Sequence, residues 1–234
     1  MISHDAMVAL LNTVPYFAGL GQTVLKAIAE RCQPRSFQAG QCVFTEGERC
    51  QHLYILESGR MKFYRTSADG REQILRVFDR PGDTFCLASA FRAGSHVVSA
   101  RAATETRLRL LDVDTVSRLA EEHPSIALKL VATAGEHMAH LVALAEDLSL
   151  KTATARLAKH LYELAVAPGV ENGKAIRLSR DRLPEEELAS MLGTVRVHIS
   201  RSLRKLARAG AIDLTREFIR IRDLKVLKQI SEPK

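Results

Sequence analysis

Hydrophobic residues recur at two different spacings along the chain, and the spacing changes twice. Residues 1–34 carry them at helical intervals, as do residues 114–121 and 124–148. Between Arg35 and Asp112 the chain instead shows short runs rich in Val, Ile, Phe and Tyr, separated by regularly placed glycines. This pattern is typical of short strands in a sandwich or barrel-like roll. We therefore predict an α+β chain in which a β-roll (a jelly roll) lies between helical segments.

The C-terminal third contains a sharply punctuated pair of predicted helices between Leu183 and Leu214. The first begins near Pro184, whose fixed φ suits a first helical position, and ends at Gly193, which can adopt a positive φ. Thr194 is expected to cap the second helix. The buried stripe of this helix is predicted to comprise Val195, Ile199, Leu203 and Leu206. An alternating segment follows and predicts a hairpin, so the whole stretch is typical of a winged helix-turn-helix.

The polar face of the second helix is basic. A charged face is usually only solvated, but the glycine turn and the Arg-rich hairpin favour contact with double-stranded DNA, whose major groove admits such a helix. The residues expected to contact DNA are Thr194, Val195, Arg196, Val197, His198, Ser200, Arg201, Arg204 and Arg220.

The positive charge of the chain is concentrated in the part that contains the predicted DNA-binding helix. The formal net charge is +7, yet residues 150–234 hold 18 Lys and Arg against 10 Asp and Glu, a net charge of +8. The preceding residues hold 16 against 17 and are nearly neutral. A basic C-terminal third is suited to phosphate binding.

A long helix is predicted at about 124–148, and its apolar residues repeat every seven positions. The predicted seam comprises Val131, Ala134, Met138, Leu141, Ala145 and Leu148. Such a stripe often packs on its own domain, but a DNA-reading helix needs a twofold partner to cover two half-sites, which favours a homodimer. We expect two domains: residues 1–149, a sensing roll with the dimerisation helix, and residues 150–234, the winged helix-turn-helix.

Other features narrow the functional classes. No apolar run is long enough for a membrane span, and the first 20 residues lack the pattern of a secretory signal, so we expect a cytoplasmic protein without a membrane partner. The four cysteines (32, 42, 50 and 86) follow no Cys-x-x-Cys spacing, which disfavours a zinc site and suits a reducing compartment. No nucleophile–base pairing, metal spacing or phosphate loop indicates an enzyme.

Three stretches of the chain are distinctive: FTEGERCQHLYILESGRMKFYRTSADGREQIL in the roll, PGD at 81–83, and ELASMLGTVRVHISRSLRKL at 187–206. Together they resemble the cyclic-AMP receptor/FNR (Crp/Fnr) family of bacterial transcription regulators. The resemblance covers most of the chain. It implies a cyclic-nucleotide-binding-like roll, a homodimer, a small effector between roll and long helix, and RNA polymerase as a further partner. The alternative, from a different class, is a ligand-binding module or an enzyme that uses the roll itself.

The resemblance also bears on cyclic AMP. Nucleotide binders of the family hold the ribose through a Gly-Glu pair and the cyclic phosphate through an Arg-Ser pair. Here Cys86 and Leu87 stand at the first pair, and Ser95-His96-Val97 stand at the second without an arginine. A buried phosphate charge without a cationic partner costs several kcal/mol, so cyclic AMP binding is not expected.

Two further effector groups occur in the family. The oxygen-sensing branch holds an iron–sulfur cluster through cysteines near its N-terminus, but no cysteine precedes Cys32 here, so a cluster is not expected. A gas-sensing branch holds haem and shares Phe-Cys after Gly-Asp, matching Phe85-Cys86, although its histidine two residues on is Ala88 here. Haem stays open beside a redox cysteine, an unknown metabolite, and no effector at all.

The candidate effector pocket comprises Cys86, Leu87, His96, Val97, His137 and Leu141. His140 is a further candidate haem ligand. The plain alternative is that the histidines are solvated or packed and that Cys86 is a small buried hydrophobe.

On the reading helix, the family contacts bases through an Arg-Glu pair and a later Ser/Gly-Arg pair. Arg196, Ser200 and Arg201 match these positions, whereas Val197 replaces the Glu and His198 replaces the usual Thr. The resemblance implies guanine or phosphate contacts by the two arginines. It also implies that Val197 loses cytosine readout and can meet a thymine methyl group instead.

Overall fold

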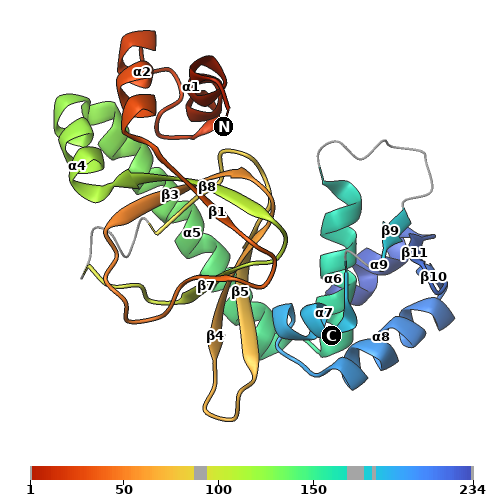
Figure 1. Ribbon diagram of the computed structural model, residues 1–234. Coiled ribbons are helices and arrows are strands. Elements are labelled where there is room, and N and C mark those ends of the chain that lie inside the picture. Colours follow the sequence, from red (N-terminus) through yellow and green to blue (C-terminus); the bar gives the residue numbers. More distant parts are fainter. Residues whose placement is uncertain (1, 87–93, 168–176, 181–182, 233–234) are drawn as a thin grey trace. The chain divides into compact units, whose positions relative to one another are not determined.

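The computed structural model describes residues 2–86, 94–167, 177–180 and 183–232 (Figure 1). The chain forms two compact units. One comprises residues 1–65 and 75–140, and the other comprises residues 66–74 and 141–234. Each unit has a hydrophobic core of its own.

A β-roll of two four-stranded sheets makes up most of the first part of the chain, and neighbouring strands of the first sheet pair antiparallel. In sheet order, the first sheet comprises β1 (Gln33–Phe37), β8 (Thr106–Asp112), β3 (His52–Ser58) and β6 (Thr84–Phe85). The second comprises β2 (Cys42–Phe44), β7 (Ser99–Ala102), β4 (Met61–Thr66) and β5 (Glu72–Phe78).

Strand β3 is apolar at consecutive positions because both of its faces are buried. Leu53 and Ile55 point into one core with the N-terminal helices, while Tyr54 and Leu56 point into the interior of the roll. Successive side chains of a strand face opposite sides, so one strand supplies two cores. This explains why the sequence there shows a continuous apolar run instead of alternation.

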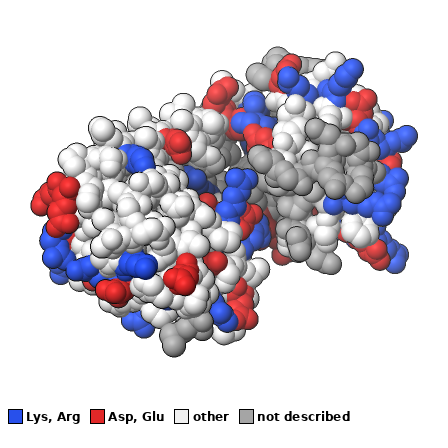
Figure 2. Space-filling model, turned by 90° about the horizontal axis from the view of Figure 1, so that it is seen from above, with Lys and Arg blue, Asp and Glu red and all other residues white. Residues whose placement is uncertain are grey.

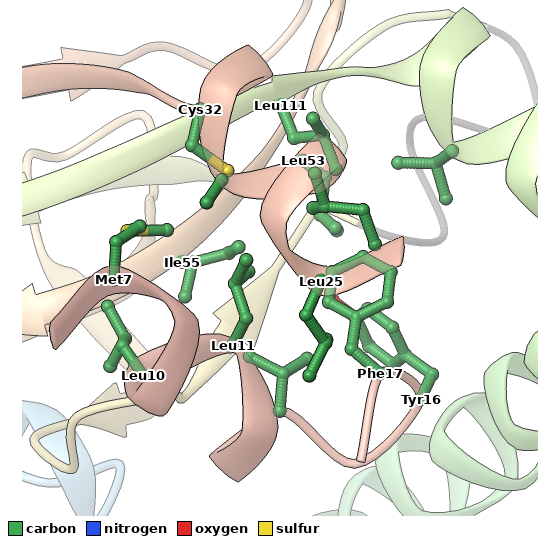
Figure 3. Packing of buried hydrophobic residues seen from close by; sticks show 14 of the residues in the cluster. Met7, Leu10, Leu11, Tyr16, Phe17, Leu25, Cys32, Leu53, Ile55 and Leu111 are labelled. Carbon is green, nitrogen blue, oxygen red and sulfur yellow. The ribbon is translucent and has the colours of Figure 1, made fainter. Parts of the chain in front are cut away.

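Helices cover the outer face of the first sheet. They are α1 (His4–Thr13), α2 (Gln22–Arg31), α4 (Val113–Glu122) and the start of the 27-residue α5 (Pro124–Leu150). Figure 3 shows Leu11, Phe17 and Leu25 packed toward Ile55 and Leu111 of the sheet. The Ser3 side chain accepts a hydrogen bond from the Ala6 amide and so caps α1.

The second unit is a small helical domain with a three-stranded sheet. Its helices are α6 (Ala153–Val166), α7 (Glu185–Met191), α8 (Arg196–Arg208) and α9 (Leu224–Ser231). The sheet has the order β10 (Ile212–Leu214), β11 (Phe218–Ile221) and β9 (Arg177–Ser179). Among the residues that the structure describes, every helix is too short or too polar to span a lipid bilayer.

The predicted α+β fold is confirmed, with a β-roll, a long helix and a C-terminal winged helix-turn-helix. One boundary is wrong: residues 33 and 34 belong to β1, not to the helical preface. Strand β1 lies at a sheet edge and, among the described strands, pairs only with β8, so most of its residues are exposed. Backbone pairing holds this strand without an apolar face, and an edge also tolerates Pro34.

Candidate nucleic-acid interface and effector site

Helices α7 and α8 are joined by the predicted glycine turn. Gly193 has a φ of +58°, and the Thr194 amide donates a hydrogen bond to the Ala189 carbonyl at 2.9 Å. The inner sides of both helices contribute Leu188, Ile199 and Leu203 to the core of the second unit. The two helices are therefore held at a fixed angle by a shared core and a left-handed turn residue.

The start of α8 differs from the prediction at two residues. The cap position is Val195, not Thr194, and no side chain caps the helix. The Thr194 hydroxyl lies 3.2 Å from Nδ1 of His198 instead. Val195 is 46% exposed, so its prediction as a member of the buried stripe is wrong. A cap residue lies outside the helical repeat, and the spacing that buries Ile199 and Leu203 does not extend to it.

The outer face of α8 gathers most of the predicted contact residues. Arg196, Val197, Ser200, Arg201 and Arg204 line one shallow depression together with Glu185 of α7. Arg204 donates a hydrogen bond to the Ser200 hydroxyl at 3.3 Å. His198 is exposed beside this face. The depression presents guanidinium groups, a hydroxyl and one aliphatic side chain, which is the chemistry that reads base edges.

Acidic side chains of α7 hold Arg196 in the free protein. Its guanidinium lies 3.4 Å from Glu186 and 3.9 Å from Glu185, and the Arg196 side chain is 67% exposed. Exposed ion pairs of this kind contribute about 0–1 kcal/mol. Arg196 can therefore exchange these partners for DNA at small cost.

The wing carries a second basic group. Arg220 of β11 lies 4.0 Å from Asp213 of β10, and Arg222 lies 3.5 Å from the same carboxylate. A hollow beside the wing is lined by Arg177, Arg216 and Arg220 among other residues. Arg177 was not predicted as part of this group, because its strand is distant along the chain and joins the wing through pairing with β11. Figure 2 shows Lys and Arg side chains gathered at the edge of this unit.

All six predicted seam residues of α5 are exposed in the single chain. Val131 is 71% and Met138 66% exposed, and Leu128 and Val142, outside the predicted seam, are exposed apolar residues as well. The helix uses other positions, such as Ile126 and Leu130, to pack on its own unit. An exposed apolar stripe of this length is unusual on a protein that functions as a monomer.

Two residues of the candidate effector pocket lie side by side in the roll. Sγ of Cys86 is 3.5 Å from Nδ1 of His96, and both residues are buried. Cys50 joins them, and the ligand atoms of the three residues lie within 4.8 Å of one another. Sequence spacing disfavoured a metal site because Cys50 and Cys86 are 36 residues apart; the fold brings them together.

The remaining pocket residues do not join this cluster. Leu87 lies outside the described residues. Val97 and Leu141 are exposed, and His137 on α5 lies near Arg76 of β5, where burial and the neighbouring guanidinium lower the pKa of the imidazole. Cys32 belongs to the core beneath the N-terminal helices, and Cys42 is exposed.

The cluster has an unusual electrostatic environment. Hydrogen bonding from Cys86, with a contribution from His96, lowers the pKa of the Cys50 thiol to about 5. Burial raises the pKa of Cys86 well above its ordinary value. The pair therefore favours one thiolate and one thiol at neutral pH. The ring of Phe44 stacks on His96 with centroids 3.6 Å apart, which fixes the imidazole.

Comparison with known proteins places this geometry in a family. Residues 34–123 match the cyclic nucleotide-binding domain, and residues 155–230 match the Crp-like helix-turn-helix domain. A CRP-like cAMP-activated global transcriptional regulator of Mycobacterium tuberculosis is 31% identical over 92% of this chain and 95% of its own length. The chain belongs to the Crp/Fnr family. The cyclic AMP receptor protein of Thermus thermophilus is similar at 28% identity over 93% of this chain and 96% of its own.

Solved structures agree at the level of the fold. FixK2 from Bradyrhizobium japonicum superposes with a TM-score of 0.73 at 24% identity, covering 87% of this chain and 98% of FixK2. As a Crp/Fnr protein, the chain is a DNA-binding transcription regulator, and its relatives are regulators and not enzymes.

Proposed function

We propose that this Crp/Fnr protein is a cytoplasmic homodimer that binds specific double-stranded DNA through α8 and is controlled by a small effector or a redox or gas signal at its β-roll. The observation that carries the proposal is the exposed face of α8. There Arg196, Ser200 and Arg201 lie in one depression, while Ile199 and Leu203 on the opposite side are buried. The helix is thus anchored on one side and presents base-reading groups on the other.

Dimerisation is supported by the exposed apolar residues of α5. Val131, Met138 and Leu141 would be removed from water against the same helix of a second chain, as in a two-stranded coiled coil. The dimer supplies a second α8 and therefore a second half-site. For a transcription regulator bound beside a promoter, RNA polymerase is the further partner that we propose.

The test of DNA recognition is a binding-site selection. The protein is mixed with random duplexes at physiological salt, bound duplexes are amplified, and the enriched sequences are read over several rounds. We expect a defined motif to emerge, since bidentate contacts discriminate each base by about 1–3 kcal/mol. A pool that remains random after repeated rounds would refute specific recognition.

We propose that the effector is not cyclic AMP, although similar proteins carry that nucleotide in their names. The part of the roll around Cys86 presents thiols, an imidazole and aromatic rings. Among the residues that the structure describes there, these groups offer no fixed cation to a cyclic phosphate, so burying its charge against them is unfavourable. Calorimetric titration with cyclic AMP at millimolar concentration should give no saturable heat. A saturating titration with a micromolar dissociation constant would contradict this prediction.

Haem does not fit Cys86 and His96 as a pair of axial ligands. To hold haem together, the two residues would need room between their ligand atoms for the iron and space around it for a flat macrocycle. Here the two ligand atoms contact each other at 3.5 Å, and the ring of Phe44 covers one face of the imidazole. The pair is therefore better suited to a small ion than to a planar macrocycle.

A further inference from the structure

The cluster of Cys50, Cys86 and His96 is assembled from three separate segments of the roll. Cys50 precedes β3, Cys86 follows β6, and His96 lies in the segment before β7. The three side chains are 5%, 7% and 3% exposed, respectively. Two thiols and an imidazole form a donor set that prefers thiophilic d10 metal ions over hard cations such as Mg²⁺.

Backbone pairing holds the three segments in place without any ion. The Cys50 amide donates to the Gly94 carbonyl at 2.6 Å, and the His96 amide donates to the Glu48 carbonyl at 2.8 Å. Cys86 directly follows Phe85, which pairs with Tyr54 of β3. The ligand atoms are therefore positioned by the sheet and by a clamped pair of loops, which lowers the cost of organising a site.

The distance between the ligand atoms of Cys86 and His96 matches that around one tetrahedral ion, and the Cys50 sulfur lies within 4.8 Å of both. A Zn²⁺ ion bound at about 2.3 Å by sulfur and about 2.0–2.1 Å by nitrogen holds the two atoms about 3.5 Å apart. The observed distance from Sγ of Cys86 to Nδ1 of His96 is 3.5 Å. The thiol of Cys50 makes two long hydrogen bonds to backbone carbonyls. Its Sγ lies 3.6 Å from the His52 oxygen and 3.9 Å from the Cys86 oxygen. These weak contacts can be exchanged for a metal bond.

The backbone at Cys86 is a second, independent sign of a built site. Its φ is +73°, and it is the one non-glycine residue with positive φ in the part of the chain that the structure describes. Such a conformation costs about 1–3 kcal/mol and is concentrated at ligand clamps. Here it directs the thiol toward Cys50 and His96.

We propose that Cys50, Cys86 and His96 bind one thiophilic metal ion per chain, Zn²⁺ or Cu⁺. The ion takes the place of any proton that the two sulfur atoms still carry, which is released to solvent, and it joins the three segments of the roll. The inference deepens the proposed function by naming a class of effector. Only the role of the ion as an effector rests on the proposed function. Metal binding is measured on the free protein and DNA binding in a separate experiment, so failure of one can be told from failure of the other.

The experiment uses the full-length, reduced and chelator-treated protein. It is equilibrated with Zn²⁺, or anaerobically with Cu⁺, passed through a desalting column, and analysed for bound metal by mass spectrometry. Competition between the two ions identifies the preferred one. Cobalt(II) serves as a spectroscopic probe, since thiolate ligation produces intense charge-transfer bands and tetrahedral geometry produces characteristic visible bands. We expect about one ion per chain and thiolate bands in the cobalt form.

Matched variants locate the site. Cys50→Ser, Cys86→Ser and His96→Gln should each weaken metal binding by about 100-fold or more, a loss at least as large as that caused by removing groups that only support metal ligands. Cys42→Ser removes an exposed cysteine outside the cluster and should bind metal like the wild type. Circular dichroism verifies that each variant is folded.

The cobalt spectrum of the wild type tests the proposal even if a variant fails to fold. The proposal is overturned if folded, reduced wild type retains neither ion, if its cobalt form lacks thiolate bands, or if Cys42→Ser abolishes binding while Cys86→Ser preserves it. A purified protein with an intense haem band, or one in which Cys50 and Cys86 form a disulfide that reductant cannot open, also overturns it.

Discussion

Met138→Glu is expected to convert the homodimer into a folded monomer. Met138 is exposed in the single chain, so the substitution leaves the chain's own core intact. In a dimer it places two carboxylates opposite each other across an apolar seam. Burying unpaired charge typically costs about 3–5 kcal/mol, which corresponds to an increase of at least about 100-fold in the dimer dissociation constant. Sedimentation velocity at micromolar concentration measures the change.

The matched control for this prediction is Ala132→Glu. Ala132 is also exposed on α5 but lies outside the apolar stripe, on the side of the helix that carries Glu136. The control should remain dimeric, and both variants should keep the circular dichroism spectrum of the wild type. Two results would contradict a dimer that presents two copies of α8 to DNA. The wild type could sediment as a monomer, or the Met138→Glu protein could dimerise as well as the wild type.

The second large effect concerns the arginines of α8 and of the wing. Arg201→Ala should flatten base preference at one position of each half-site, because a bidentate contact to guanine discriminates by about 1–3 kcal/mol. Arg220→Ala should weaken binding to all DNA sequences alike. It should also reduce the slope of log binding constant against log salt concentration by about one for each phosphate that the wing no longer neutralises. Arg220 lies on the wing beside Asp213, whereas Arg201 lies in the depression on α8.

Both variants are compared with the wild type by site selection and by anisotropy titrations at several salt concentrations. Each side chain is at the surface, so neither truncation should change the melting temperature appreciably. If Arg220→Ala changes the selected sequence while Arg201→Ala leaves it intact, α8 meets DNA with a different face.

The elements that the sequence predicted well are those with strong local signals. The glycine turn at Gly193, the helical spacing of Ile199 and Leu203, and the proline start of α5 are all specified within a few residues. Strand β1 lacked such a signal. It exists because β8 offers it a backbone partner about 70 residues later in the chain, so the polar sequence from Gln33 gave no indication of it.

The cluster of Cys50, Cys86 and His96 could be predicted from the sequence only in part. A family resemblance points to Cys86 and His96 but not to Cys50, and no metal-binding spacing connects the three. They meet because β6 pairs with β3 and because the segment around Gly94 pairs with the segment around Glu48. These are long-range pairings, which periodicity and spacing do not encode. At the start of α8 the error is of the opposite kind. The helical spacing predicted Val195 as a buried residue of the helix, but it is the cap residue.

The symmetry of the selected DNA tests the central claim most directly, because it reports on the reading helix and on the dimer together. A twofold dimer that presents two α8 helices reads an inverted repeat, with half-site centres about 10–10.5 base pairs apart or a multiple of that spacing. The selection should therefore yield a palindromic motif, with its most strongly conserved guanines at equivalent positions in both halves. A motif made of one half-site, or a direct repeat, would contradict the account.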